Sequence, residues 1–241
     1  MTKPEYKYNQ YNEIDWTNQD KTLINSLVNQ YIIDEILSQK SGDSVKIFDM
    51  GFGIGLFFEM LNKHLPLKYK NILIEGCEPS EKNYKYFINM KSNLFKDVNI
   101  KTYYSTFLET VPDEKFDFIS AIYVFPHISS EELNHTAYKI NQLLEQDGKF
   151  ILVVANEEYL QDRWNSDEST IIERKVFHYK GKDYHEVLHY SDLPEIGRLV
   201  DLNRGDDLYI QILADNDFQL ESKEVLNDNG FLCSVYILKK L

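Results

Sequence analysis

The chain has 241 residues, which is enough for one α/β domain with a sizeable core and an insertion. Its 39 acidic residues outnumber its 26 basic ones, and the net charge of −13 argues against a nucleic-acid partner, because such binders present a basic stripe. No stretch is apolar over the length of a membrane span, and no secretory signal is recognisable. We therefore expect a single domain over residues 1–241 that is cytoplasmic and binds neither nucleic acid nor membrane.

A helix is predicted near the amino terminus. Asp20 can cap an apolar pattern at helical spacing, which ends at Gly42. Before it, residues 1–19 mix tyrosines and a tryptophan with polar residues in no regular pattern. A frayed terminus with aromatic side chains on the surface is one interpretation of this segment.

The central motif runs from Val45 to Phe58 and reads VKIFDMGFGIGLFF. An apolar run of β-forming residues ends at Asp49, glycines follow at alternate positions, and apolar residues then resume at helical spacing. This order indicates a strand, a glycine turn and a helix. Glycine allows the backbone angles of such a turn and lets a ligand lie against bare backbone. A dinucleotide fingerprint would place its last glycine at Leu56, whereas this chain has Gly51, Gly53 and Gly55.

At this turn the sequence resembles the class I S-adenosylmethionine-dependent methyltransferases, in particular their small-molecule branch, whose motif is acidic-x-Gly-x-Gly-x-Gly. The resemblance covers roughly residues 45–155. It implies an α/β fold with a doubly wound, mostly parallel sheet, helices on both faces and an antiparallel carboxyl-terminal hairpin. It also implies S-adenosylmethionine as the cofactor, in contact with Asp49 and the three glycines.

The resemblance gives residues 1–40 a second interpretation, as a lid and a helix. Many small-molecule members of this family close an amino-terminal segment over the cofactor, and tyrosine rings could face its sulfonium in a cation–π arrangement. On this interpretation we assign Tyr11 to catalysis, and Tyr8 and Trp16 to acceptor binding.

The second strand is predicted over residues 71–77 and is followed by Glu78, Pro79 and Ser80. Glu78 lies where a doubly wound fold places the acidic residue that accepts hydrogen bonds from ribose hydroxyls, a little over twenty residues beyond the last glycine. A surface glutamate at a strand end is the alternative, but position, residue type and the Ser80 cap together favour ribose binding. The resemblance implies that Pro79 lies flat against the adenine.

A third strand is predicted over residues 98–104. Many family members carry an aspartate just after it that contacts the adenine amino group, and this chain has a serine there. The departure leaves adenine recognition to a hydroxyl or to the backbone of Ser105, Thr106 and Phe107.

The fourth strand is predicted over Phe116–Phe125, a nearly continuous apolar run that is typical of a central parallel strand. His127 follows it, at the edge where ligands and catalytic groups of such sheets gather. His127 is therefore a candidate base, and a structural histidine that contacts the cofactor or a helix is the alternative. We assign Tyr123, at the end of the same run, to the cofactor site.

The regular strand–helix alternation breaks over residues 156–204, after the fifth strand, and we predict a substrate-side insertion there. Its clearest part is a β-hairpin with Gly181-Lys182 as a two-residue turn, which would pair Lys180 with Asp183. A helix over 206–214 and a closing hairpin complete the chain.

The two faces of the inserted hairpin differ in character. One carries His178, His185 and His189, which we interpret as a solvent-exposed face without a metal ion, since no cysteine or carboxylate cluster accompanies them. The other face is aromatic and should pack on the domain or cover the acceptor pocket. We assign Tyr184 and Tyr190 to acceptor binding.

Together these features predict an enzyme that transfers the methyl group of S-adenosylmethionine to a nitrogen or oxygen of a small molecule. No metal is expected, because catechol-type relatives carry acidic ligands after the fourth strand, where this chain reads YVFPH from Tyr123. A protein side-chain methyltransferase and an inactive S-adenosylmethionine-binding partner are alternatives. The glycine spacing argues against a nicotinamide or flavin oxidoreductase. The acceptor and the oligomeric state stay open at this point.

Overall fold

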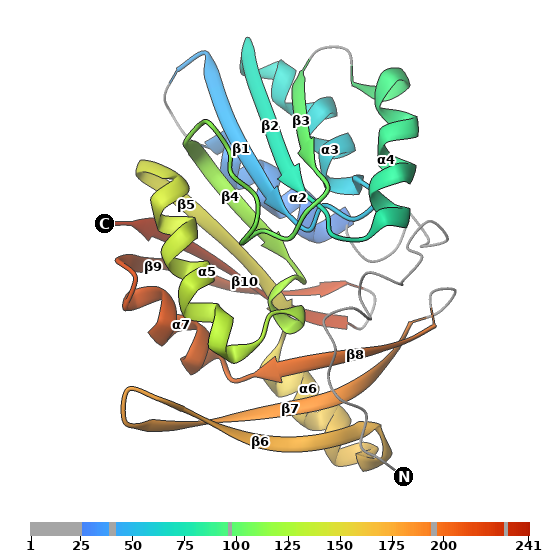
Figure 1. Cartoon of the computed structure of the whole chain (residues 1–241), viewed down its shortest axis with the longest axis vertical. Coiled ribbons are helices and arrows are strands. Elements are labelled where there is room, and N and C mark those ends of the chain that lie inside the picture. Colours follow the sequence, from blue (N-terminus) through green and yellow to red (C-terminus); the bar gives the residue numbers. More distant parts are fainter. Residues whose placement is uncertain (1–25, 39–41, 96–97, 194–196, 229–230) are drawn as a thin grey trace.

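The larger of two sheets determines the architecture of the molecule. The computed structural model describes residues 26–38, 42–95, 98–193, 197–228 and 231–241. The larger sheet has seven strands in the order β3-β2-β1-β4-β5-β10-β9, with helices on both faces (Figure 1). Strands β1 to β5 pair in parallel, and β10 runs antiparallel between β5 and β9, which confirms the predicted fold class. The strands are β1 (Ser44–Met50), β2 (Asn71–Cys77), β3 (Asn99–Tyr103), β4 (Phe116–Ile122), β5 (Leu144–Ala155), β9 (Phe218–Asp228) and β10 (Phe231–Lys240).

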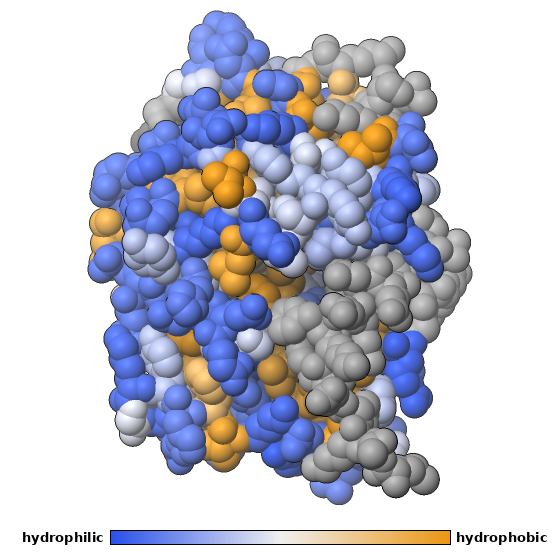
Figure 2. Space-filling model, viewed as in Figure 1, coloured by the Kyte–Doolittle hydropathy of each residue, from blue (hydrophilic) through white to orange (hydrophobic). Residues whose placement is uncertain are grey.

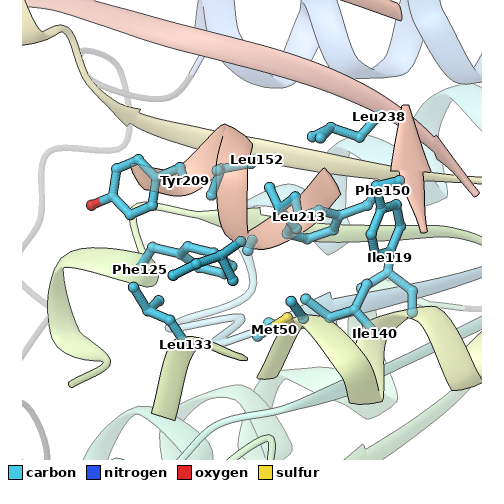
Figure 3. Close-up of a cluster of buried hydrophobic side chains, with 14 of the residues drawn as sticks. Met50, Ile119, Phe125, Leu133, Ile140, Phe150, Leu152, Tyr209, Leu213 and Leu238 are labelled. Atoms are coloured by element: carbon cyan, nitrogen blue, oxygen red, sulfur yellow. The ribbon is translucent and has the colours of Figure 1, made fainter. Parts of the chain in front are cut away.

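Two hydrophobic cores lie on opposite faces of this sheet, because successive strand residues point to opposite sides. Phe150 and Leu152 of β5 pack with α5 and α7 (Figure 3), whereas Ile151 between them points to the other core. Each buried side chain of this size contributes about 1.5–3 kcal/mol. The helices are α2 (Ser26–Ser38), α3 (Leu56–His64) and α4 (Glu81–Leu94) on one face, and α5 (Ser130–Leu143) and α7 (Asp206–Ala214) on the other.

Strand β4 ends at Ile122, earlier than the predicted Phe125. Tyr123 adopts a left-handed backbone conformation, with φ 58°, which a residue with a side chain rarely takes. The chain then forms the short 3₁₀ helix η3 (Phe125–His127) instead of continuing the strand. This change of direction places His127 on a turn at the carboxyl end of β4.

The insertion is larger than the predicted hairpin. It consists of α6 (Glu157–Ser166) and a second, three-stranded antiparallel sheet in the order β6-β7-β8. In Figure 1 this sheet lies below the main one, with β8 nearest to it. Helix α6 packs on it through Leu160 and Trp164, which contact Val187. Its strands are β6 (Ile171–Tyr179), β7 (Lys182–Leu193) and β8 (Gly197–Arg204).

The turn of the inserted hairpin lies one residue earlier than predicted. Strands β6 and β7 pair Tyr179 with Lys182, so Lys180 and Gly181 form the turn, and the predicted pair of Lys180 with Asp183 is wrong. Both turn residues have positive φ, 47° and 80°, as a type I′ turn requires. Because the register differs from the predicted one by two residues, an even number, each side chain keeps its predicted face.

The surface is mainly hydrophilic on the face that Figure 2 shows, where hydrophobic residues are visible in small groups between polar ones. This distribution accords with the net charge of −13. Within the described residues, no helix combines the length and apolar character that crossing a bilayer would need.

Candidate active site

Three of the predicted segments meet at the carboxyl edge of the main sheet. The strand order reverses between β1 and β4, and in open α/β sheets ligands bind in the crevice outside such a switch point. The glycine turn follows β1, Glu78 follows β2, and the loop with His127 follows β4. The candidate site is built from these three strand ends.

The glycine turn joins β1 to α3, and its glycines serve different purposes. Gly51, Gly53 and Gly55 all have left-handed φ angles, 65°, 56° and 85°. A Cβ on Gly55 would overlap the Phe87 ring, so that glycine lets α4 pack against the turn. A Cβ on Gly53 would meet nothing within 4 Å. Gly53 therefore presents bare backbone to open space, which is the surface a bound cofactor needs.

Glu78 connects the end of β2 to the glycine turn. Its carboxylate is fully buried and accepts hydrogen bonds from the backbone N–H groups of Gly53 and Ser80, each at 2.8 Å. The side-chain amide of Asn83 donates a third, longer bond at 3.5 Å. A carboxylate offers about four lone-pair positions, so these three donors do not use all of its acceptor capacity. Burial raises the pKa of Glu78 to about 7, although the backbone donors oppose the shift.

Asp49 is the second buried carboxyl group at this turn. It is the penultimate residue of β1, it is 3% exposed, and the Ser120 hydroxyl donates a hydrogen bond to it at 2.7 Å. Burial raises the pKa of Asp49 to about 7; the Ser120 hydrogen bond opposes this rise, and the nearby Glu78 adds to it. Two buried carboxyl groups with pKa values near neutrality favour a positively charged ligand, which would stabilise their ionised forms.

The end of β4 lies directly against the glycine turn. A Cβ built on Gly51 would stand 3.0 Å from a methyl group of Val124, so the two segments are in close contact. Tyr123 precedes Val124, and its backbone N–H is bonded to the carbonyl of Val153 at 2.9 Å. The strained conformation of Tyr123 is of the kind that collects at functional sites, where surrounding structure holds it in place.

His127 lies at the end of η3, with its side chain 17% exposed. Its Nδ1 is 3.7 Å from a carboxylate oxygen of Asp201, which belongs to β8 of the inserted sheet. Burial lowers the pKa of His127 below its ordinary value of 6.5, and Asp201 counteracts part of this effect. The imidazole is therefore neutral at pH 7 and has a lone pair with which to accept a proton.

Arg204, the last residue of β8, holds the loop that carries His127. Its buried guanidinium donates to the carbonyls of Phe125 at 3.0 Å and Ile128 at 2.6 Å, on either side of His127. It also donates to the Ser130 hydroxyl and forms an ion pair with Glu186, both at 2.9 Å. Phe125 is itself anchored in the core near Tyr209 (Figure 3). Sequence reasoning missed Asp201 and Arg204, because neither stands in a recognisable motif.

The residues proposed for adenine recognition form a compact turn after β3. The Ser105 hydroxyl lies 2.6 Å from that of Thr110, and Thr106 donates to Glu109 through both its backbone and its hydroxyl. Phe107 is 7% exposed, and its ring packs on that of Phe48. Its side chain therefore belongs to the core. Pro79 is half-buried at the end of β2.

The residues proposed for acceptor binding are placed differently from one another. Tyr184 is 4% exposed and belongs to the hydrophobic core, so the structure gives it a packing role. Tyr190 is half-buried and lies under the guanidinium of Arg198, 4.9 Å from its ring centre. The remaining candidates, all in the proposed lid, lie outside the described residues; they are Tyr8, Tyr11 and Trp16.

The three histidines of the inserted hairpin do not form a uniform exposed face. His185 is exposed, and His178 is paired with Asp183 at the surface. His189 is 1% exposed and packs edge-on against Trp164 of α6, with the ring centres 5.4 Å apart. The prediction of a solvent-exposed histidine face is wrong for His189, because α6, which was not predicted, covers that part of the sheet.

Comparison with known proteins identifies a family. A family model described as a methyltransferase domain matches residues 24–205, a range that includes the glycine turn, the His127 loop and the inserted sheet. A comparison with curated proteins found no match.

Solved structures with the same fold include several methyltransferases. An S-adenosylmethionine-dependent methyltransferase from Clostridium acetobutylicum ATCC 824 is 15% identical, with a TM-score of 0.60 over 88% of this chain and 90% of the other. The magnesium protoporphyrin IX methyltransferase of Synechocystis PCC 6803 is 12% identical, with a TM-score of 0.62 over 89% and 82%. The glycopeptide N-methyltransferase MtfA is 12% identical, with a TM-score of 0.61 over 89% and 95%. At these identities the likeness concerns the fold.

Proposed function

From the premise that this chain belongs to the S-adenosylmethionine-dependent methyltransferases, we propose that it methylates a nitrogen or oxygen of a small-molecule acceptor without a metal ion. The main support is the contact between Gly51 and Val124, which places the bare backbone of the glycine turn next to the loop that carries His127. A cofactor on the turn and a base at the end of β4 would then face one crevice.

The residues at the glycine turn fit this cofactor. When bound, S-adenosylmethionine supplies an electrophilic methyl group on a positively charged sulfur. Gly53 leaves room for it against the backbone, and the buried Asp49 and Glu78 offer negative charge nearby. We assign the remaining acceptor capacity of Glu78 to a ribose hydroxyl, and Tyr123 to the wall of the same site.

His127 supplies the base in this proposal. Methyl transfer is an in-line displacement, so the protein has to position the acceptor, exclude water and remove a proton from acceptors that carry one. The neutral imidazole of His127 takes the proton from an acceptor N–H or O–H group. Its low exposure keeps competing water away, and Arg204 fixes its loop on both sides.

The segment after β4 favours metal-independent chemistry. Relatives of the catechol type carry acidic ligands there, whereas this chain has Tyr123, Val124 and Phe125. An acceptor held by contacts with the protein itself is therefore expected, with an amine or a hydroxyl as the methylated group.

A product-release screen tests the proposal. The protein is incubated with S-adenosylmethionine and panels of amines, phenols and carboxylic acids, and S-adenosylhomocysteine is quantified with and without EDTA. Acceptor-dependent release that survives EDTA supports the proposal. Cofactor binding without S-adenosylhomocysteine release on any panel would instead indicate an inactive binding protein. With methyl-labelled S-adenosylmethionine, label recovered in a protein fraction would indicate a side-chain methyltransferase. A Gly53→Val variant that circular dichroism shows to be folded is the control, because its side chain would enter the cofactor's space; the fold has to be checked since φ is 56° at this position.

A further inference from the structure

Asp201 of β8 approaches His127 from the inserted sheet. Their closest atoms, Nδ1 of the imidazole and one carboxylate oxygen, are 3.7 Å apart, and each side chain is 17% exposed. The two residues are brought together by Arg204, which fastens the end of β8 to the carbonyls around His127. A partly buried carboxylate at this distance is screened less than an exposed one and raises the pKa of the histidine, although burial of the ring lowers it more.

The Asp201 carboxylate is itself held in one orientation. The Ser191 hydroxyl of β7 donates a hydrogen bond of 2.6 Å to its second oxygen, so the first oxygen is left to face His127. A base, a carboxylate that orients it and a donor that fixes the carboxylate make a recurrent catalytic arrangement. The separation of 3.7 Å is longer than a hydrogen bond, and catalytic hydrogen bonds are often long until a ligand is bound.

A second histidine near Asp201, His189, already has hydrogen-bond partners for both of its ring nitrogens. His189 pairs with Asp201 across β7 and β8, but its Nδ1 lies 3.1 Å from the Tyr190 carbonyl and its Nε2 contacts the Asn203 amide. Burial lowers the pKa of His189, so this ring is neutral, with a proton on Nδ1 and an accepted hydrogen bond on Nε2. Asp201 also raises the pKa of His189, but the hydrogen bonds of the His189 ring go to Tyr190 and Asn203 and do not engage the Asp201 oxygen that faces His127.

The other charged groups close to this pair are compensated. On β8 and β7, Arg204 and Glu186 form a buried ion pair of 2.9 Å, so their charges largely cancel at His127. Arg163 of α6 acts on His189, whose pKa it lowers. Asp201 raises the pKa of the His127 imidazole, against the larger lowering caused by burial.

We propose that Asp201, supported by Ser191, is a positioning residue for His127 in methyl transfer, an inference that rests on the proposed function. Asp201 holds the tautomer with the proton on Nδ1, so the lone pair of Nε2 points to the acceptor. When Nε2 takes the acceptor's proton, the carboxylate stabilises the imidazolium that forms. The proton remains on His127 until solvent removes it, and no other reactant is consumed.

The pH–rate profile of Asp201→Asn tests this role. The amide has no charge, so the pKa of His127 should fall and the acidic limb of kcat should move to lower pH. At neutral pH kcat should fall roughly tenfold or more, while the affinity for S-adenosylmethionine and the acceptor KM stay within about twofold. Ser191→Ala should move the acidic limb of kcat in the same direction, but by a smaller amount than Asp201→Asn does. Asp183→Asn is the matched control, because it removes the carboxylate of an exposed aspartate–histidine pair in the same sheet.

An NMR titration of the His127 ring separates this inference from the proposed function, because it requires no acceptor. A lower His127 pKa in Asp201→Asn than in the wild type supports the pairing, even if no acceptor on the panels is methylated. An unchanged His127 pKa overturns it, even in an active enzyme. If Asp201→Asn fails to fold by circular dichroism, the same comparison in Ser191→Ala decides, and an unshifted titration there overturns the inference.

Discussion

Glu78 accepts a 2.8 Å hydrogen bond from the backbone of Gly53, 25 positions earlier in the chain, and so joins two strand ends at the cofactor side of the sheet. The carboxylate fixes the turn and would also accept a hydrogen bond from the cofactor's ribose. The shape of the turn and its affinity for the cofactor therefore depend on the same side chain.

Replacing Glu78 should weaken the binding of both S-adenosylmethionine and S-adenosylhomocysteine, because both carry the ribose to which we assign its hydrogen bond. Glu78→Gln keeps the size and shape of the side chain but places an amide N–H group against the backbone donors. Losing hydrogen bonds to a charged acceptor costs about 1.5–3 kcal/mol of binding free energy. Calorimetry should show affinities roughly 10- to 150-fold lower. The control is Glu75→Gln in the same strand, which is buried and bonded to Tyr103 instead of the turn. Equal affinities in wild type and a folded Glu78→Gln variant would remove Glu78 from the site.

Cofactor affinity should rise with pH through about 7. Burial raises the pKa values of Asp49 and Glu78 to about 7, so both are partly protonated near neutrality, and a bound sulfonium favours their ionised forms. Binding should therefore release protons. Calorimetry at pH 6.5, about half a unit below the shifted pKa values, measures this release when it is repeated in two buffers of different ionisation enthalpy. S-adenosylhomocysteine, which lacks the sulfonium charge, should release fewer. Heats that are the same in both buffers would contradict this expectation.

Asp49 should make the ligand-free protein less stable as pH rises. Its pKa is raised from an ordinary 3.8 to about 7, so between these values the folded state binds more protons than the unfolded state. The free energy of unfolding then falls across that window, by at most on the order of 4 kcal/mol. Asp49→Asn, whose amide oxygen can still accept from Ser120, should reduce this dependence in urea titrations and leave the part that comes from the raised pKa of Glu78. Asp43→Asn, which removes an exposed partner of Lys70, should leave it in place.

His127→Ala should lower turnover by roughly 10²-fold or more while cofactor affinity stays nearly unchanged. The imidazole is assigned to the acceptor's proton and belongs to the loop after β4, whereas the buried carboxyl groups Asp49 and Glu78 belong to β1 and to the end of β2. Steady-state kinetics and calorimetry on the same preparation measure both effects. His185→Ala, an exposed histidine of the inserted sheet, is the control. A full-rate His127→Ala enzyme would rule out the base, and joint loss of folding and binding would support a structural role.

The main sheet and the cofactor side could be predicted because their signals are local in sequence. The glycine turn follows a β-forming run directly, and Glu78 follows the next one, so their meeting is a consequence of parallel strands sharing one edge. The same rule placed His127 at that edge. Even here the sequence did not indicate that Glu78 would be fully buried and bonded to Gly53.

The inserted sheet could not be predicted to the same depth, because long-range contacts determine it. Helix α6 is largely polar, and Leu160 and Trp164 give only one helical repeat of buried residues. Asp201 and Arg204 gain their roles from contacts with a loop more than seventy positions earlier. The hairpin turn was misplaced because Gly181 was assigned to the first turn position, whereas a type I′ turn accepts Lys180 there and glycine second.

Arg204 should be the residue through which the inserted sheet stabilises the loop that carries His127. Its side chain is fully buried, and Arg204→Met would leave Glu186 as an unpaired buried charge and remove the guanidinium donors from the carbonyls of Phe125 and Ile128. Breaking a buried ion pair in this way costs about 3–5 kcal/mol. The double variant Arg204→Met with Glu186→Gln should recover part of this loss in urea titrations, because no uncompensated charge remains. It should nevertheless stay impaired in kcat, since the loop around His127 still lacks its donors.

The control for Arg204 is Arg198→Met. Arg198 forms an exposed ion pair with Asp192 in the same sheet, and such pairs contribute about 0–1 kcal/mol. Its loss should therefore change the free energy of unfolding little. If Arg204→Met were as stable as Arg198→Met and kept the wild-type kcat, the guanidinium would not hold the loop, and the link between the inserted sheet and His127 would have to be sought elsewhere.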